Sequence, residues 1–144
     1  MNTASPSNDA FTGQVVLPYR REDIEAAERS IFQEVERHGY THASLFAVRL
    51  SLEEALSNAF KHGNKGDAHK VVRLAYQVTD DAVILDITDE GEGFDPQSIP
   101  DPTDQENLEI PCGRGLKLIR SFMTEVQIFP PGNRLRMTYA KPAE

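Results

Sequence analysis

Two polar residues four positions apart, Glu54 and Asn58, are the first whose types and spacing could do chemistry. They stand in LSLEEALSNAFKHGNKGD, a segment with the apolar spacing of an amphipathic helix. Residues four apart in a helix point in nearly the same direction, so the carboxylate and the carboxamide would share one face. A carboxylate can serve as a general base toward a hydroxyl, and a carboxamide oxygen can coordinate Mg²⁺. The same spacing also fits an ordinary solvated face, and the helix alone does not decide between these interpretations.

A second motif, Asp89-x-Gly91-x-Gly93, follows an apolar segment that has the character of a strand. A carboxylate held at a strand end can accept a hydrogen bond from the exocyclic amine of adenine. The glycines would let the backbone turn sharply and pass close to a flat base. The alternative is a simple strand-end turn, because aspartate and glycine favour turns in any case.

A third motif, Gly113-x-Gly115-Leu116, opens a segment with helical spacing. The free N–H groups and the positive dipole at the start of a helix attract anions, so this entrance could receive phosphate. A hinge or a plain helix start is the alternative, and a single motif of this kind is weak evidence.

The elements that must position these motifs follow from the apolar periodicity. The predicted helices cover residues 21–37, 41–62 and 113–123, and the predicted strands cover residues 13–19, 70–79, 82–88, 125–130 and 134–140. Residues 96–111 contain four prolines and a cluster of acids, which indicates a lid-like loop. Successive helices and hairpin strands predict an α/β fold, a two-layer sandwich with helices on one face of a mixed, mostly antiparallel sheet. We expect a flexible tail over residues 1–10 and a single domain over residues 11–144.

The composition limits the classes of partner. The net charge of −8 argues against nucleic acid or an anionic membrane as the main partner. The one cysteine, Cys112, excludes an internal disulfide and fits a reducing compartment. The sequence has no apolar run of the roughly 20 residues that cross a bilayer and no signal peptide at its start, so we expect a cytoplasmic protein.

The three motifs in this order resemble the GHKL (Bergerat-fold) ATP-binding superfamily, which includes histidine kinases. More narrowly, the chain is similar to the bacterial anti-sigma factor serine/threonine kinases. The narrower resemblance rests on EEALSNAFKHGN, DEGEGFDPQSIPDPTDQENL and GRGLKLIRSFMTEV. It extends from about residue 11 to residue 139 and implies a histidine-kinase-like ATPase domain with a short lid.

The resemblance implies ATP and Mg²⁺ as cofactors and a role for each motif. Glu54 would be the general base, Asn58 the Mg²⁺ ligand and Asp89 the adenine-binding carboxylate. The residues that would surround the nucleotide are Asn58, His62, Asp89, Gly91, Gly93, Gly113, Arg114, Gly115 and Leu116. His62 also fits a structural hydrogen-bonding role.

One position departs from the family pattern. Lys117 follows Gly-Leu where close relatives often carry an apolar or aromatic residue. The helical spacing places it beside Arg120 on the polar side, away from Leu116 and Ile119. A lysine at this position could alter contacts with phosphate or with a partner, but it leaves the predicted fold unchanged.

The resemblance further implies phosphoryl transfer to a STAS-domain anti-anti-sigma factor and sequestration of a sigma factor. Two other classes stay open, an ATP-gated binding module without kinase activity and an ATPase that directs water at the phosphate. Glu54 disfavours the first. The short lid and the lack of a further domain disfavour the second. A homodimer is left open.

Overall fold

The computed structural model describes residues 10–92 and 111–143. The helices in these ranges are α1 (Arg21–Arg37), α2 (His42–Asn58) and α3 (Pro111–Phe122), and a π-helical turn, η2 (Ala59–Gly63), continues α2. The strands are β1 (Phe11–Pro18), β2 (Val71–Val78), β3 (Ala82–Thr88), β4 (Glu125–Phe129) and β5 (Arg134–Ala140). None of the helices in the described ranges is long and apolar enough to cross a lipid bilayer.

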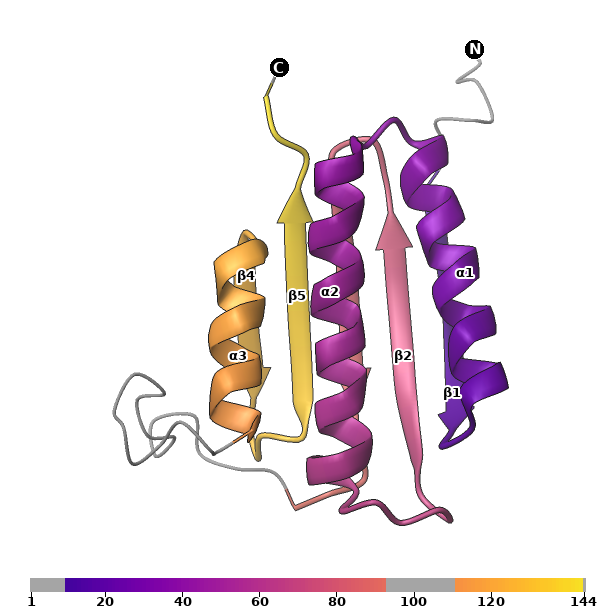
Figure 1. Ribbon diagram of the computed structural model, residues 1–144, viewed down its shortest axis with the longest axis vertical. Helices are drawn as coiled ribbons and strands as arrows, with labels where there is room; N and C mark the ends of the chain where they lie inside the picture. The colour runs from indigo at the N-terminus through magenta and orange to yellow at the C-terminus, as the bar shows by residue number, and fades with distance from the viewer. Residues whose placement is uncertain (1–9, 93–110, 144) are drawn as a thin grey trace.

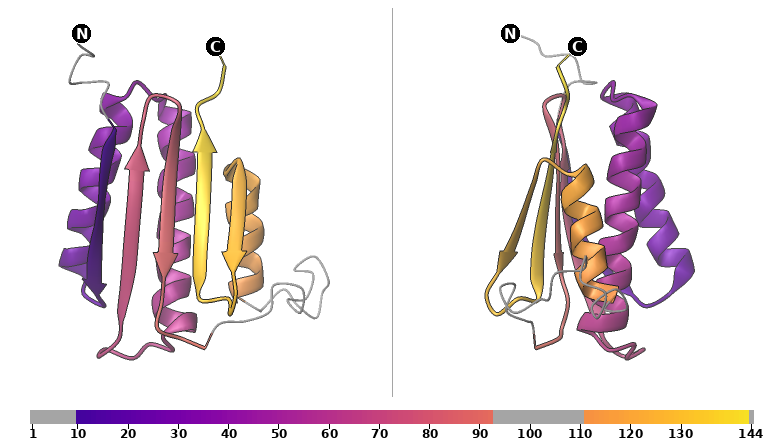
Figure 2. Two further views of the ribbon diagram at one scale, coloured as in Figure 1. Left: turned by 180° about the vertical axis from the view of Figure 1, so that it is seen from behind. Right: turned by 60° about the vertical axis from the view of Figure 1, so that its left-hand side comes forward.

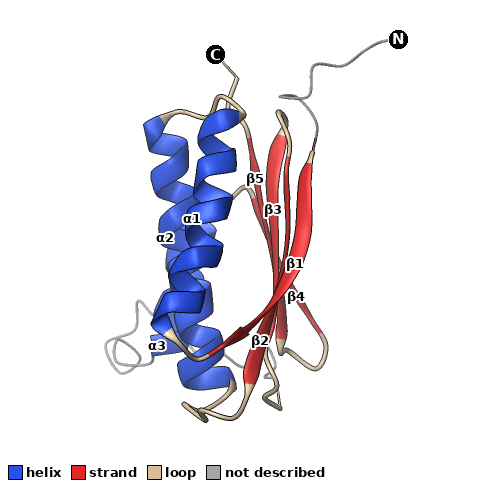
Figure 3. Cartoon of the chain, turned by 90° about the vertical axis from the view of Figure 1, so that its right-hand side faces the viewer, coloured by secondary structure: helices blue, strands red, loops and turns tan. Residues whose placement is uncertain are grey.

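The strands form one sheet in the order β1-β2-β3-β5-β4, and the helices lie together on one face of it (Figures 1, 2 and 3). This arrangement confirms the predicted two-layer fold. Every neighbouring pair of described strands is antiparallel, so the parallel pairing of a mixed sheet does not occur among them. The reason is the connectivity, because β1 and β2 become antiparallel neighbours across the α1–α2 pair and the remaining neighbours are joined mainly by hairpins.

The core lies between the two layers and follows the sequence periodicity. Alternate strand residues such as Leu74, Leu85 and Met137 point toward the helices and are fully buried. The apolar stripe along α2 is buried as well, except that Leu45 is half-buried. Its fully or nearly fully buried members are Val48, Leu52, Leu56 and Ala59.

Most element boundaries agree with the prediction, and the exceptions have physical reasons. The first helix and the strand over residues 82–88 have the predicted bounds, whereas β1 begins two residues earlier than expected. The predicted start of the third helix at residue 113 is wrong, because α3 begins at Pro111. Proline suits the first position of a helix, where its missing N–H costs no hydrogen bond.

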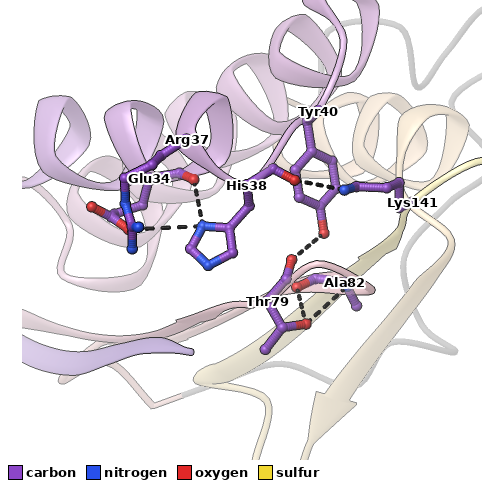
Figure 4. A network of polar contacts seen from close by, with 7 residues as sticks. All are labelled: Glu34, Arg37, His38, Tyr40, Thr79, Ala82 and Lys141. Carbon is purple, nitrogen blue, oxygen red and sulfur yellow. Dashed lines mark hydrogen bonds and ion pairs between the residues drawn. The ribbon is translucent and has the colours of Figure 1, made fainter. Parts of the chain in front are cut away.

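One end of the sandwich is held together by side chains that reach between elements (Figure 4). The end of α1 is closed by Gly39, whose φ of 84° suits glycine. The ammonium of Lys141 donates to the backbone carbonyl of His38 at 2.6 Å. The hydroxyl of Tyr40 donates to the carbonyl of Thr79 at 2.8 Å. We call this region, defined by His38, Tyr40, Thr79 and Lys141, the tethered end.

Candidate nucleotide-binding site

The opposite end of the sandwich gathers the predicted site. There the last turns of α2 and η2, the residues after β3, the β4–β5 turn and the start of α3 come together at the lower end of Figure 1. These segments enclose a cavity of about 300 Å³. We call this region the cavity end. The cavity is lined by Ala55, Asn58, Ala59, His62, Gly63, Lys65, Ile87, Asp89, Glu92, Leu116, Ile128, Gly132, Asn133, Arg134 and Leu135.

The cavity has apolar walls and a few polar groups. Aliphatic side chains from the helical layer and from the sheet face one another across it, among them Leu116, Ile87 and Leu135. Asp89 and Asn58 contribute the carboxylate and the carboxamide. Small-molecule sites have this character, with apolar surface for affinity and a few fixed polar groups for orientation. The arrangement suits a flat heteroaromatic ring with an amine at its edge.

Asn58 and Glu54 stand one turn apart on α2, as predicted. Asn58 is the last residue of α2 and lines the cavity. Its carboxamide packs directly against Gly115 of α3, so that a Cβ at that glycine would collide with the amide nitrogen. Glu54 is half-buried and lies outside the set of cavity-lining residues. The pair therefore spans from the cavity wall to the adjoining surface of α2.

The π-helical turn η2 decides where the chain goes after Asn58. The amide of Asn64 donates to the carbonyl of Ala59 at 2.8 Å, five residues back, where an α-helix would bond four residues back. The extra residue in the turn widens the helix at its end. His62 and Gly63 consequently lie along the cavity, although the His62 side chain remains exposed. Such single π-turns are frequent at functional sites.

Asp89 is held at the end of β3 by the β4–β5 turn. Its amide donates to the carbonyl of Asn133 at 2.9 Å, and the Asn133 side-chain amide donates back to the Asp89 carbonyl at 2.9 Å. One carboxylate oxygen, Oδ1, accepts from the amide of Gly91 at 2.7 Å. Burial raises the pKa of this carboxyl, against the lowering effects of the Gly91 amide and of Lys70. The backbone is fixed, and the second oxygen remains available to a ligand in the cavity.

Glycines occupy the positions where the backbone passes closest to Asp89. A Cβ at Gly63 would collide with the Asp89 carboxylate, and one at Gly91 would collide with the carbonyl of Gly63. Side chains at either position would push the turn after α2 away from the end of β3. The sequence motifs predict a role for Gly91 and none for Gly63. The signal that could have found it is the HGN triplet directly after the helix.

Asn64, for which the sequence motifs also predict no role, stabilises the same region. Although its side chain is fully buried, it is satisfied at both ends. Its amide donates to the carbonyl of Val71 at 3.0 Å, and its oxygen accepts from the amide of Glu90 at 2.7 Å. The Glu90 carboxylate in turn accepts from the amide of Val71 at 2.8 Å. Asn64 thus ties the end of η2 to the start of β2 and to the segment that carries Asp89.

The remaining predicted residues fall into two groups. Gly115 and Leu116 lie in the second turn of α3, and Leu116 lines the cavity. Gly113 and Arg114 lie in the first turn. Because α3 begins at Pro111, the amide of Gly115 is inside the helix, and the prediction that the Gly113-x-Gly115 motif opens the helix is wrong for Gly115. Gly93 and the predicted lid, except for its last residue, lie outside the described residues.

The described residues offer few protein ligands for Mg²⁺. Within the described ranges no three histidine, cysteine, aspartate or glutamate residues are grouped so that they could hold a metal ion. Mg²⁺ commonly binds through one or two protein oxygens, the phosphates of its nucleotide and water. The carboxamide of Asn58 at the cavity wall fits such a shared site, in which most ligands come from the nucleotide and the solvent.

Comparisons with known proteins agree with this geometry. Residues 17–139 match the family described as the histidine kinase-like ATPase domain. Since the match covers most of the sequence, the chain belongs to the histidine kinase-like ATPase domain family. ATP is accordingly the ligand class that the family implies for the cavity.

The relatives narrow this assignment. The serine-protein kinase RsbW of Oceanobacillus iheyensis is 25% identical over 121 residues, which cover 80% of this chain and 77% of that protein. The serine-protein kinase RsbW of Staphylococcus aureus is 30% identical over 110 residues, which cover 71% of this chain and 69% of that protein. These matches confirm the resemblance to the anti-sigma factor serine/threonine kinases.

A solved structure supports the fold independently. The crystal structure of the RsbU and RsbW domains of Rv1364c from Mycobacterium tuberculosis superposes with a TM-score of 0.58 at 16% sequence identity. The match covers 92% of this chain and 33% of that longer one. At this identity the likeness concerns the fold alone.

Proposed function

We propose that the chain is an ATP-dependent serine/threonine protein kinase that acts as an anti-sigma factor in the cytoplasm. Its substrate would be a STAS-domain anti-anti-sigma factor, and it would also sequester a sigma factor. The observation that carries the proposal is the cavity, which has Asp89 and Asn58 in its walls and Glu54 one helical turn away. The kinase names of the relatives point to the same chemistry.

Each residue would have a separate task in this reaction. The free oxygen of Asp89 would accept a hydrogen bond from the adenine amine, while Leu116 and Ile87 cover the faces of the ring. Asn58 would hold Mg²⁺, and the first turn of α3, with Gly113 and Arg114, would lie toward the phosphates. When bound, Mg²⁺-ATP supplies the phosphoryl group and the charge neutralisation on which this transfer depends.

Glu54 would act as the general base toward the substrate hydroxyl. In the described part of the chain its carboxylate has no hydrogen-bonding partner, and its half-buried side chain is not among the residues that line the cavity. A serine or threonine hydroxyl that arrives from solvent could therefore reach it without entering the nucleotide cavity. The carboxylate would orient the hydroxyl and accept its proton as the bond from its oxygen to the γ-phosphorus forms and the bond between that phosphorus and the leaving ADP breaks.

The competing function is an ATP-gated binding module without transfer activity. The residues that would bind ATP are the same in both cases, so the cavity alone does not separate them. Glu54 favours the kinase, because nucleotide binding by itself needs no general base beside the metal ligand. A water-directed ATPase is the third class, and it would release phosphate without any protein partner.

A single-turnover assay tests the proposal. The chain is incubated with γ-labelled ATP, Mg²⁺ and a purified STAS-domain protein from the same organism, and label on that protein is followed with time. We expect transfer to a serine or threonine that depends on Mg²⁺. If ATP binds but no candidate partner is labelled, the binding-module function is favoured. Phosphate release in the absence of any partner would indicate the ATPase.

A further inference from the structure

The most exposed large apolar side chain in the described ranges is Phe46, on the first half of α2. It is 55% exposed, compared with 50% for Val16 and 41% for Tyr19. Its ring lies edge-on to that of Phe122 in α3, with the centroids 5.9 Å apart. An isolated apolar residue on a surface is common and needs no explanation, but an aromatic pair that joins two helices in view of solvent is a candidate contact site.

Two contacts fix how α2 and α3 lie against each other. Phe46 near the start of α2 meets Phe122 at the end of α3, and Asn58 at the end of α2 meets Gly115 near the start of α3. The two helices therefore run antiparallel, side by side, as Figure 1 shows. The surface along their junction leads from the aromatic pair to the cavity end.

Apolar residues continue along this junction toward the site. One turn after Phe46 is Leu50, and one turn before Phe122 is Leu118, and both are half-buried. The next residue in the same row of α2, four positions beyond Leu50, is Glu54. We call the surface formed by Phe46, Leu50, Leu118 and Phe122 the apolar strip. It ends at the residue that would receive the substrate hydroxyl.

The distance between Phe46 and Glu54 indicates that a protein substrate bound at Glu54 would also contact the apolar strip. Eight residues of helix separate Phe46 from Glu54, which corresponds to about 12 Å along the axis. A standard protein–protein contact buries ~800 Å² on each partner, an area roughly 30 Å across. A folded protein that presents a serine or threonine to Glu54 would therefore also lie over the apolar strip.

The charges beside the strip favour a partner with an acidic rim. Although the whole chain carries a net charge of −8, the exposed charged side chains that the structure describes on α3 are Lys117 and Arg120, both basic. An apolar centre with a charged border is the usual composition of a protein contact. Lys117 is also the position that departs from the family pattern, which makes it a candidate for partner choice.

We propose that the apolar strip is the docking surface for the protein substrate of the kinase, with Phe46 as its main anchor. This inference rests on the proposed function and adds the surface through which the substrate is recognised. The partner would present a small apolar patch, bordered by acidic residues, about two helical turns from its acceptor hydroxyl. A second copy of this chain is the alternative occupant.

The test compares Phe46→Ser with Val16→Ser, a matched control. Both residues are about equally exposed, and Val16 belongs to β1, at the far edge of the sheet from α3. Phosphorylation of the purified STAS-domain protein is measured against its concentration. We expect Phe46→Ser to raise KM about tenfold or more, as loss of an aromatic anchor does, with kcat nearly unchanged. Val16→Ser should retain the parent KM, and Phe46→Leu should recover most of the loss.

Further measurements separate the ways in which the inference can fail. Calorimetric ATP affinity and the circular dichroism spectrum of Phe46→Ser should equal those of the parent, which rules out damage to the site or the fold. Lys117→Glu should raise KM by a smaller factor that shrinks with added salt.

An unchanged KM in Phe46→Ser, while the parent is active, would overturn the docking surface and leave the kinase proposal intact. A change confined to the oligomeric state, measured by light scattering, would assign the strip to a second copy and overturn the inference. If the parent labels no STAS protein, the proposed function fails, and the strip inference fails with it.

Discussion

The tethered end and the cavity end are both rich in hydrogen bonds, but they use them differently. At the tethered end, side chains from separate elements bond directly across the gap, as Tyr40 does to Thr79 and Lys141 does to the His38 carbonyl (Figure 4). At the cavity end, the side chains of Asn64 and Asn133 bond to the backbone of the segments that border the cavity. The first arrangement joins the helical layer to the sheet, and the second fixes the segments that surround the cavity.

Burial affects the ionisable groups of the two ends in the same direction with different consequences. It raises the pKa of Tyr40 to about 12, with a smaller contribution from Asp80, so that its hydroxyl remains a donor at every physiological pH. Burial also raises the pKa of Asp89, yet one oxygen of that carboxyl has no protein donor among the described residues. We infer that the tethered end contributes mainly to stability, whereas the cavity end keeps polar groups for a ligand.

The largest expected effect is on transfer chemistry at the cavity end. Glu54→Gln keeps the size of the side chain and removes its basicity. Phosphorylation of a STAS-domain substrate should fall by roughly 10²–10⁴, the usual contribution of a general base, while ATP affinity and thermal stability stay at parent values. A single-turnover assay beside calorimetry measures both. Asn58→Ala is the contrasting variant and should weaken Mg²⁺-dependent ATP binding itself. Transfer by Glu54→Gln at the parent rate would remove Glu54 from its proposed role.

The next prediction concerns a glycine that only the structure reveals. In Gly63→Ala the new methyl group would collide with the Asp89 carboxylate, so the turn after α2 must move away from β3. We expect ATP affinity to fall on the order of 10²-fold and stability to fall by about 1–3 kcal/mol, the usual cost of overpacking.

The control for Gly63→Ala is Gly66→Ala in the same loop. Gly66 has a φ of 72° and open space around its Cβ direction. That change should cost only ~1 kcal/mol of backbone strain and leave ATP affinity unaltered. Equal ATP affinities for the two alanine variants would show that the contact with Asp89 is unimportant.

The two glycines illustrate which features of the site can be predicted from the sequence and which require the structure. The apolar period defined α1 and β3 to the residue, and the spacing of Glu54, Asn58 and Asp89 indicated the site. The π-turn could not be foreseen, because a shift from four-residue to five-residue bonding leaves no residue pattern. The roles of Asn64 and Asn133 depend on which strands become neighbours. That information lies in the tertiary structure, since Asn64 bonds to Glu90, 26 positions ahead, and Asn133 bonds to Asp89, 44 positions back.

A pair of nearly isosteric substitutions compares the two ends directly. Asp89→Asn keeps the acceptor for the Gly91 amide but can turn a donor toward the adenine amine, so ATP affinity should fall about 30-fold. Its stability at neutral pH should equal or exceed that of the parent, because a neutral amide is buried in place of a carboxylate whose pKa burial has raised. Tyr40→Phe should change stability and leave ATP binding intact. It leaves ATP affinity unchanged and costs about 1 kcal/mol through the lost hydrogen bond to Thr79.

Calorimetry and thermal unfolding of the two variants give all four values. A loss of ATP affinity in Tyr40→Phe would contradict the division of roles between the ends, and so would a clear loss of stability in Asp89→Asn.

The smallest expected effect belongs to neither end and concerns Glu28, in the groove between α1 and α2. Burial, followed by the charges of Glu53 and Glu25, raises its pKa from 4.5 to about 7, against the opposing effect of Arg49. Because the folded state holds this proton more tightly than the unfolded chain, the free energy of unfolding should decrease as pH rises from 4.5 to about 7. The group is only half-buried. After solvent screening, the decrease should therefore stay below ~1 kcal/mol.

Glu28→Gln should remove this contribution to the pH dependence of the free energy of unfolding. The variant should match the parent near the acid end of that range and be slightly more stable above neutrality, with ATP affinity unchanged throughout. Denaturant unfolding at several pH values measures the difference, with Glu22→Gln, an exposed glutamate at the start of α1, as the control. If parent and Glu28→Gln keep the same difference at every pH, the proton is not held by Glu28. Asp89 would then be the next residue to test, because burial raises its pKa in the same direction.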